Sequence, residues 1–379
     1  MKYCIKCLET DTRPNTKIDS TGICFACQNF KKDFVKYDEG FLYEYLDKMI
    51  KLHPRKKNNK YDCVIGVSGG KDSLRQAIWV RDKLNLIPLL VCAPYSPEQI
   101  TKAGADNLSN LINHGFDLIV TGPAPETWKK ILKKGFYSGN YIRGPELVLQ
   151  SCVPAAAIKN DIELIFWGES PASIWNDKKT KAKDEFDGNF LRNLNTLNNC
   201  DTSWMLDQID HKSKLIPYTY PDVIEFKKKK LQIIFLNPFL HDWSYINNAK
   251  FAVANGLKVR NINPEHDGDL YGITSIDDTW VPINQMIKFY KYGFGRASDY
   301  INFEIRNGNI TRHQGINILE KYDGRCSQKL INSFCKYIQI SKDEFWSQIA
   351  KYVNKDLFTA NNQRSKKYKR KFKVGYGII

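Results

Sequence analysis

Two kinds of apolar pattern follow one another along this chain. Short, nearly continuous apolar runs predict strands, and they recur at residues 63–67, 88–93, 118–121, 162–167 and 231–236. Helical patterns separate them, including residues 72–84 and a stretch that begins at a capping box, Ser96 to Gln99, and ends near residue 113. Strands that alternate with helices and are apolar on both faces indicate a parallel sheet covered by helices. The expected fold class is α/β.

The flanking regions have a helical pattern. Residues 33–52 predict one helix, followed by a polar stretch up to residue 60. Beyond about residue 244 the stripe from Ile283 to Tyr290 has helical spacing, which is typical of core packing, and capping boxes predict helices that start at Thr311 and Ser341. We therefore expect a cysteine module at 1–32, a helix and linker at 33–60, a sheet domain at 61–243, a helical region at 244–360 and a basic tail at 361–379.

Four of the ten cysteines have the spacing of a metal site. Cys4 and Cys7 form one Cys-x2-Cys pair, and Cys24 and Cys27 form a second pair after an interval of sixteen residues. Each pair brings two sulfur atoms to one tight turn, so two pairs predict a closed tetrahedral site in a zinc-ribbon-like module. All four ligand positions are filled, which indicates a structural metal. Zinc is expected, and ligand type alone leaves an iron–sulfur cluster open.

The charge balance makes polyanionic partners worth considering. The 379 residues include 57 Lys and Arg against 41 Asp and Glu, a formal charge of +16, and the tail at 361–379 has seven of these cations and no acid. Such runs are also typical of a solvated surface. There is no run of about 18 apolar residues and no apolar core at the start, so we expect a cytoplasmic protein without membrane insertion.

The stretch after the first strand predicts phosphate binding. Residues 68–73 read Ser-Gly-Gly-Lys-Asp-Ser and lead directly into a helix. Glycines let backbone N–H groups approach an anion, the helix N-terminus carries partial positive charge, and the lysine adds a full charge. The loop is not a Walker A loop, because Ile65 and Asp72 stand where that motif needs Gly and Ser or Thr.

The loop resembles the signature of the PP-loop ATP pyrophosphatases, whose fold is that of the adenine nucleotide alpha hydrolases. Those enzymes split ATP into AMP and pyrophosphate while AMP is attached to a substrate oxygen. The resemblance implies that pyrophosphate is held by Ser68, Gly69, Gly70 and Ser73. It further implies that Lys71 neutralises pyrophosphate and that Asp72 holds Mg²⁺ directly or through water.

At least two families combine two N-terminal Cys-x2-Cys pairs with a PP-loop domain. The tRNA thiolases, for which the +16 charge would suit nucleic acid, replace a base oxygen by sulfur and use further cysteine sites. The six remaining cysteines here contain no Cys-x2-Cys pair, which argues against sulfur transfer. A zinc-and-nucleotide binding module without catalysis is a third reading.

Most of the chain resembles the N-acetyl sugar amidotransferases of bacterial surface-polysaccharide biosynthesis, which serve lipopolysaccharide O-antigen or nonulosonic-acid and flagellin-glycan pathways. Besides the two cysteine pairs and the loop, the matching stretches are Thr12-Arg13-Pro14, Ile165 to Ser170, Lys291-Tyr292-Gly293-Phe294-Gly295-Arg296-Ala297-Ser298-Asp299 and Lys321-Tyr322-Asp323-Gly324. The resemblance implies that ATP and ammonia convert an N-acetyl group, on a free or nucleotide-linked amino sugar, into an acetamidino group.

Other polar residues are candidates for this chemistry. Glu169 follows a strand at the sheet edge where open α/β sheets bind ligands, so it is expected to orient the sugar or ammonia, or else to be an exposed carboxylate. Asp277 and Asp278 would bind Mg²⁺ or the amidine, or lie in a surface loop. Arg296 would meet a nucleotide or sugar phosphate, or form a salt bridge.

The source of ammonia is expected to be another protein. A glutaminase nucleophile needs Cys on a Gly-x-Cys-x-Gly elbow or at position 2, and Cys152 and Lys2 fit neither pattern. The resemblance implies a separate glutaminase subunit, bridged by a cyclase-like barrel subunit.

Overall fold

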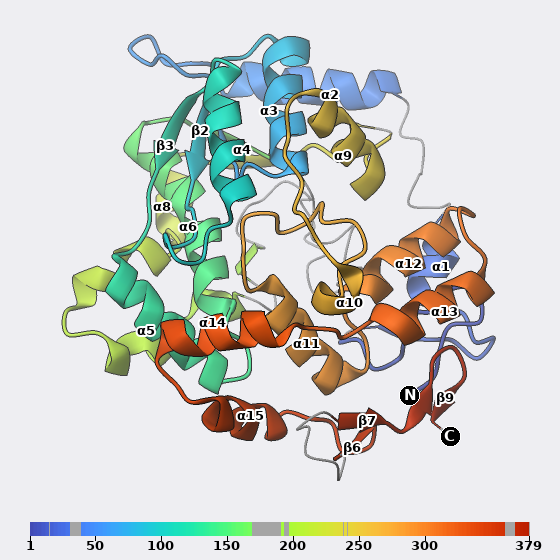
Figure 1. The fold of residues 1–379 in the computed structure, drawn as a ribbon. Coiled ribbons are helices and arrows are strands. Elements are labelled where there is room, and N and C mark those ends of the chain that lie inside the picture. The colour runs from blue at the N-terminus through green and yellow to red at the C-terminus, as the bar shows by residue number, and fades with distance from the viewer. Residues whose placement is uncertain are drawn as a thin grey trace. The chain divides into compact units, whose positions relative to one another are not determined.

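The computed structural model describes residues 1–14, 16–30, 39–168, 191–192, 197–237, 239–240, 242–360 and 368–378. The chain forms two compact units (Figure 1). The cysteine unit comprises Met1–Val35, Asn261–Gly272 and Trp280–Ile379, and the sheet unit comprises Lys36–Arg260 and Ile273–Thr279. Each unit therefore gathers segments that are distant in the sequence.

The sheet unit contains a five-stranded parallel sheet, which confirms the α/β class. The strands are β1 (Cys63–Gly66), β2 (Pro88–Cys92), β3 (Asp117–Val120), β4 (Leu164–Trp167) and β5 (Gln232–Phe235), in the order β3-β2-β1-β4-β5. All four pairings are parallel, with Cys63 opposite Pro88 and Val64 opposite Ile165. The five apolar runs of the sequence are these strands.

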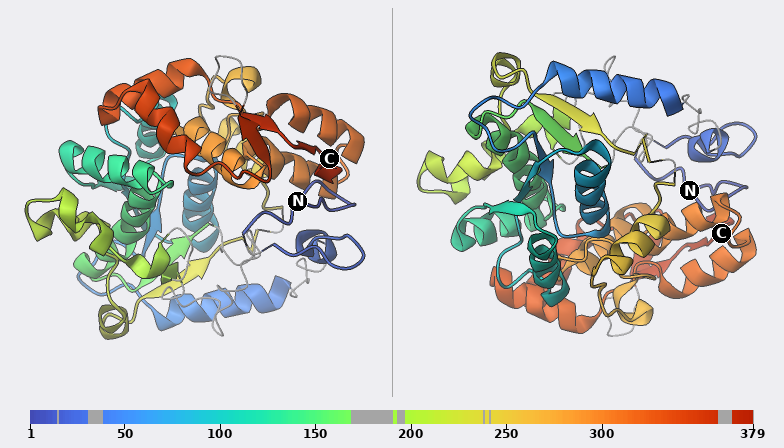
Figure 2. Two further views of the ribbon diagram at one scale, coloured as in Figure 1. Left: turned by 90° about the horizontal axis from the view of Figure 1, so that it is seen from below. Right: turned by 90° about the horizontal axis from the view of Figure 1, so that it is seen from above.

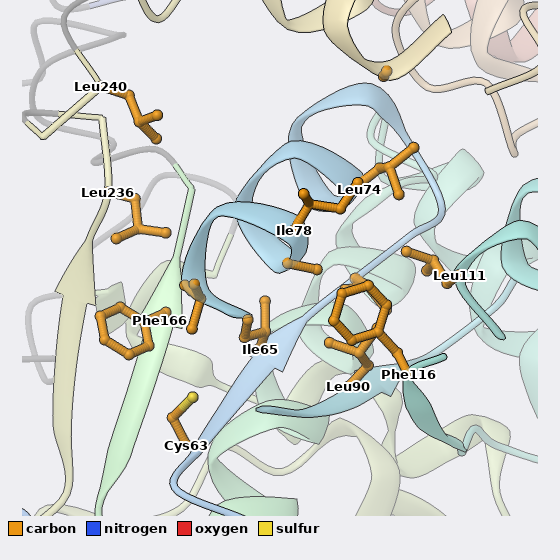
Figure 3. Packing of buried hydrophobic residues seen from close by; sticks show 14 of the residues in the cluster. Cys63, Ile65, Leu74, Ile78, Leu90, Leu111, Phe116, Phe166, Leu236 and Leu240 are labelled. Carbon is orange, nitrogen blue, oxygen red and sulfur yellow. The ribbon is translucent and has the colours of Figure 1, made fainter. Parts of the chain in front are cut away.

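Helices cover both faces of the sheet, and the alternation of side chains along each strand separates the two layers. On one face Cys63, Ile65 and Phe166 share a buried cluster with α2 (Glu39–Leu52), α3 (Lys71–Leu84), α4 (Lys102–Asn113) and α9 (Tyr245–Ala254) (Figure 3). The other face packs on α6 (Arg143–Lys159), which also contacts α5 (Pro125–Tyr137). There a Cβ on Gly66 would lie only 2.8 Å from Val153. Helices therefore cover both faces of the central strands, as their apolar sequences require.

The predicted start of α4 is wrong by five residues. Thr101, not Ser96, caps the helix and accepts from the Gly104 amide at 2.9 Å. The side chain of Gln99 is engaged elsewhere, because it donates to Asp278 at 2.9 Å and accepts from Trp128 at 2.9 Å.

The remaining elements of the sheet unit follow β4. They are η3 (Asn198–Cys200), η4 (Ser203–Gln208), η5 (Lys212–Tyr218) and α8 (Val223–Lys228). The strand order reverses next to β1, because β2 and β3 follow on one side of it and β4 and β5 on the other (Figure 2). This reversal is the topological switch point of the sheet. Open α/β sheets bind ligands outside the carboxyl ends of the strands at this switch point.

The cysteine unit is mostly helical, as the pattern beyond residue 244 predicts. Its elements are α1 (Phe25–Asn29), α10 (Pro264–Asp267), α11 (Val281–Tyr292), α12 (Arg296–Arg306), α13 (Arg312–Tyr322), α14 (Gln328–Ile338), α15 (Lys342–Ala350), β6 (Phe358–Ala360), β7 (Tyr368–Arg370), β8 (Phe372–Lys373) and β9 (Gly377–Ile378). Residues 368–378 of the basic tail thus form short strands, with β7 antiparallel to β6 and β9 to β8. Among the helices of the described ranges, none has the length and apolar character to cross a membrane.

Two motifs of the C-terminal region hold each other. Asp323 accepts from the Gly295 amide at 2.8 Å and from the Ser298 hydroxyl at 2.6 Å, so it caps the start of α12. A Cβ on Gly295 would lie 2.7 Å from the Asp323 carboxylate, which explains the glycine. The next residue, Gly324, has a φ of +78° and packs against the ring of Phe289.

Gly324→Ala is expected to lower the free energy of unfolding by about 2–4 kcal/mol. The new Cβ would lie 2.3 Å from Phe289, which adds a steric cost to the left-handed backbone. Gly308→Ala is the matched control, because Gly308 has a φ of +77° and no atom within 4 Å of its Cβ position. That variant should lose only about 1 kcal/mol in urea denaturation. Equal losses at both positions would contradict the packing explanation.

Candidate functional site

The turn between β1 and α3 presents backbone amides to the carboxyl end of the sheet. β1 ends at Gly66, α3 begins at Lys71, and the N-cap residue Gly70 is extended with no side chain bonded at the cap. The first N–H groups of a helix have no partner within the helix, so they form an anion-binding position with the partial positive charge of the helix N-terminus.

Gly69 fits this turn because it lacks a side chain. Its φ is +76°, and a Cβ would lie 3.1 Å from backbone atoms of Asn107 and Leu108 in α4. Asn107 is itself fixed, since its side chain donates to the Lys258 carbonyl and accepts from the Lys258 amide, each at 2.8 Å. The loop therefore rests against a rigid part of α4.

The two serines of the loop shape its backbone. The Gly70 amide donates to the Ser68 hydroxyl at 3.3 Å, and the Ser73 hydroxyl donates to the Gly70 carbonyl at 3.0 Å. Both serines line a cavity of about 200 Å³. The cavity is bordered by Gly66, Val67, Ser68, Asp72, Ser73, Gln76, Val91, Ala93, Leu149, Cys152, Val153, Trp167 and Gly168.

Lys71 and Asp72 form a charged pair at the same place. Lys71 is 3% exposed, bonds the Asp72 carboxylate and lies 5.0 Å from the ring centroid of Tyr245. The other oxygen of Asp72 accepts from the Asn248 amide at 2.6 Å. The helix α9 therefore orients the carboxylate that the sequence offers as a Mg²⁺ ligand.

Sequence reasoning missed Asn248 and the residues that hold it. Its side-chain oxygen accepts from Arg75 at 2.5 Å, and Arg75 also pairs with Asp242. Asn248 stands 176 positions after Asp72. No spacing rule links residues so far apart, so only the packing of α9 on α3 reveals the contact.

The other candidate residues of the sheet unit are Glu169, Asp277 and Asp278. Glu169 falls outside the described residues, although its neighbour Gly168 lines the cavity. Asp278 is buried and accepts from Gln99 at 2.9 Å and Tyr141 at 3.2 Å. Asp277 lies beside the first turn of α4, where a Cβ on Gly104 would approach it to 2.7 Å. Neither aspartate is among the described residues that border the cavity.

Two carboxylates of the sheet unit have strongly raised pKa values. Burial raises the pKa of Asp277 to about 7, with a further rise from Asp278 that Arg260 opposes. Burial also raises the pKa of Glu146, on α6, to about 7. Such shifts are common at functional sites, and the sequence pattern did not single out Glu146.

Arg296 belongs to a charged network of the cysteine unit. Asp299 accepts from Arg13 at 2.6 Å and from Lys288 at 2.9 Å. Burial would raise the pKa of Asp299, but the charges of Lys288, Arg13 and Arg296 hold it well below its usual range. Arg13 also bonds Glu9 at 2.7 Å. Its bond to Asp299 joins the N-terminal module to α12. Arg296 therefore acts on this network through its charge on Asp299.

The four cysteines of the two pairs come together as their spacing predicts. The sulfur atoms of Cys4, Cys7, Cys24 and Cys27 all lie within 4.8 Å of one another, and the Cys7 and Cys24 sulfurs are 3.7 Å apart. A tetrahedron with metal–sulfur bonds of about 2.3 Å has sulfur atoms about 3.8 Å apart. The cluster therefore has the dimensions of a four-thiolate metal site.

Backbone groups around the cluster bond its sulfur atoms and hold the first knuckle. Backbone amides donate to three of the sulfurs, for example from Cys24 to Cys4 at 3.3 Å and from Glu9 to Cys7 at 3.4 Å. Hydrogen bonds with the Cys24, Cys27 and Cys7 thiols lower the pKa of Cys4, whereas the pKa values of Cys7, Cys24 and Cys27 are raised. Arg312 donates to the Cys7 carbonyl at 3.0 Å, so α13 fixes the first knuckle.

The fold and these residues define an α/β protein with a glycine-rich turn at the carboxyl end of its sheet and a four-cysteine cluster. Residues 269–373 match the family model described as "LPS biosynthesis protein WbpG-like, C-terminal domain". No curated protein matches the chain. The matched stretch includes α11 to α14 and the Asp323 cap of α12. It connects this chain with proteins of lipopolysaccharide biosynthesis.

Ionised Asp277 is expected to destabilise the sheet unit. Its folded pKa lies above the ordinary value near 3.8, so its contribution to stability is present below about pH 4 and is lost as pH rises through about 7. Asp277→Asn should therefore gain about 2 kcal/mol over the native protein at pH 8 and almost nothing at pH 4.5, measured by urea denaturation without added Mg²⁺. Exposed Asp356→Asn is the control. A gain that is independent of pH would contradict the assigned burial.

Proposed function

We propose that this protein is an ATP-dependent N-acetyl sugar amidotransferase of lipopolysaccharide or related surface-glycan biosynthesis. The observation that carries the proposal is the turn at residues 67–70. Its backbone amides, Lys71 and Asp72 lie beside a small cavity at the switch point of the sheet. The match of residues 269–373 to a lipopolysaccharide biosynthesis domain supports the pathway. The PP-loop signature supports cleavage of ATP to AMP and pyrophosphate.

The reaction converts a poor leaving group into a good one. The acetamido oxygen attacks the α-phosphorus of ATP, a new P–O bond forms, and the bond to the β-phosphate breaks with its electron pair leaving on pyrophosphate. Ammonia then adds to the activated carbon, and AMP departs with the former acetamido oxygen. The products are the amidinium, AMP, pyrophosphate and one proton.

The residues of the turn perform the electrostatic part of this reaction. The amides after Gly69 and the Lys71 ammonium stabilise the charge that gathers on pyrophosphate. Asn248 keeps Asp72 oriented, and Asp72 is the residue that would hold Mg²⁺. The ion would supply further neutralisation of the phosphates when bound. Positioning the reacting groups of the two substrates at the cavity supplies the rest.

Sulfur transfer, as in the tRNA thiolases, is disfavoured by the thiol at the site. Cys152 borders the cavity, and burial raises its pKa to about 12. A thiol with that pKa stays protonated and is a poor nucleophile at neutral pH. It also lies inside α6, where no glycine elbow exposes it. We therefore propose that ammonia comes from a separate glutaminase subunit through a cyclase-like barrel subunit.

The adenylating activity can be tested on the protein alone with ammonium chloride. A panel of UDP-linked N-acetyl hexosamines should stimulate formation of AMP and pyrophosphate from ATP, measured by chromatography. Lys71→Met should lower kcat by about 100-fold or more, because the charge on the leaving pyrophosphate loses its counterion. Lys83→Met, at the exposed end of the same helix, is the matched control. Release of ADP, or stimulation by tRNA instead of sugars, would contradict the proposal.

We further propose that the cysteine cluster binds one Zn²⁺ as a structural ion, since four thiolates leave no open coordination position. Desalted protein should contain one zinc per chain by mass spectrometry. Cys7→Ser should lose the metal and unfold the cysteine unit at lower temperature. Cys335→Ser, a buried cysteine of α14, should keep the zinc. Iron with a visible charge-transfer band would identify an iron–sulfur cluster instead.

A further inference from the structure

One side chain at the cavity has a buried polar atom without a partner. Gln76 lies on α3, one turn after Ser73, and is 3% exposed. Its Nε2 donates to the Gly66 carbonyl at 2.9 Å, whereas Oε1 has no hydrogen-bond partner among the described residues. A flipped amide would bring two acceptors together at Gly66, so Oε1 is fixed as an acceptor.

The position of this oxygen is defined by the end of β4. A Cβ added to Gly168 would lie 3.3 Å from Oε1, and Gln76 and Gly168 both border the cavity. The walls around them are largely apolar, with Val67, Val153 and Trp167 among the lining residues. A buried acceptor without a donor is unfavourable, so the arrangement points to a ligand that carries one N–H and an apolar group.

We infer that Gln76 binds the N–H of the substrate's acetamido group, an inference that rests on the function proposed above. The acetamido group has one donor and one methyl group, which suit one fixed acceptor and apolar walls. In a trans amide the N–H and the C=O point in opposite directions. Holding the N–H at Gln76 therefore turns the reacting oxygen away from that wall, into the cavity that Ser68 and Asp72 also border.

The contact becomes stronger as the reaction proceeds. When the acetamido oxygen bonds the α-phosphorus and pyrophosphate leaves, the nitrogen lone pair moves into the C–N bond and the N–H becomes a cationic donor. A fixed acceptor stabilises this charge more than it stabilises the neutral amide. Loss of the contact should therefore lower kcat more than it raises KM. An O-acetyl ester has no N–H, so the site should reject it.

Two variants test the contact by different routes. Gln76→Met keeps the length of the side chain and removes the acceptor, but it also removes the donor to Gly66. Gly168→Ala leaves that donor in place and covers Oε1 with a methyl group, at the cost of a small shift of Trp243, whose ring would be 3.2 Å away. Gly122→Ala is the control, because nothing lies within 4 Å of its Cβ position.

The experiment measures AMP formation with the most active UDP-linked N-acetyl hexosamine and with its N-methylacetamido analogue. Both variants should lose about 10- to 100-fold in kcat/KM with the N-acetyl sugar, while ATP affinity and the control remain unchanged. The native enzyme should discriminate against the N-methyl analogue by a similar factor, and Gln76→Met should treat the two sugars alike.

The outcomes separate this inference from the proposed function. Full activity of both variants, or equal discrimination by Gln76→Met and the native enzyme, would overturn the role of Gln76 and leave the amidotransferase proposal intact. A matching loss of ATP affinity would assign Gln76 to the nucleotide and also overturn it. Failure of every N-acetyl sugar to stimulate the native enzyme would remove the proposed function itself.

Discussion

The site depends on the close approach of Gly69 to α4. Gly69 has a left-handed backbone and no Cβ, so the turn can pack closely on Asn107. A Cβ at Gly69 would lie 3.1 Å from Asn107. This contact leaves the amides at the start of α3 facing the carboxyl end of the sheet, next to Lys71 and Asp72. The neighbouring contacts hold the arrangement, since Asn107 is bonded to Lys258 and Asp72 to Asn248. The proposed phosphate binding and the proposed adenylation both require this geometry.

The cysteine unit is held together by helix capping, glycine packing and ion pairs. Its motif residues Gly295, Asp323 and Gly324 are explained by packing and capping, because Asp323 caps α12 at Gly295 and Gly324 packs on Phe289. The ion network of Arg13, Asp299 and Lys288 ties the N-terminal module to α11 and α12. Residues 269–373, which match the family model, include these packing and capping contacts. The residues expected to do chemistry on ATP lie in the sheet unit.

The sequence predicted what depends on local pattern. The five strands, the turn after β1 and the grouping of four cysteines follow from periodicity and spacing, and the structure agrees on each. What it missed depends on contacts between distant segments. α4 is capped by Thr101 and not by Ser96, and the Gln99 side chain bonds the distant residues Asp278 and Trp128. The bond from Asn248 to Asp72 and the unpartnered oxygen of Gln76 arise only when α9 and β4 pack beside α3. Local propensity contains no information about such pairs.

The central claim is that AMP is attached to the acetamido oxygen of the substrate. The most direct measurement follows that oxygen, using an N-acetyl sugar labelled with ¹⁸O in its acetyl group, together with ATP and ammonium. Mass spectrometry of the products should find the label in AMP and none in pyrophosphate. Label in orthophosphate together with ADP, or AMP without label beside an amidinated product, would contradict the account.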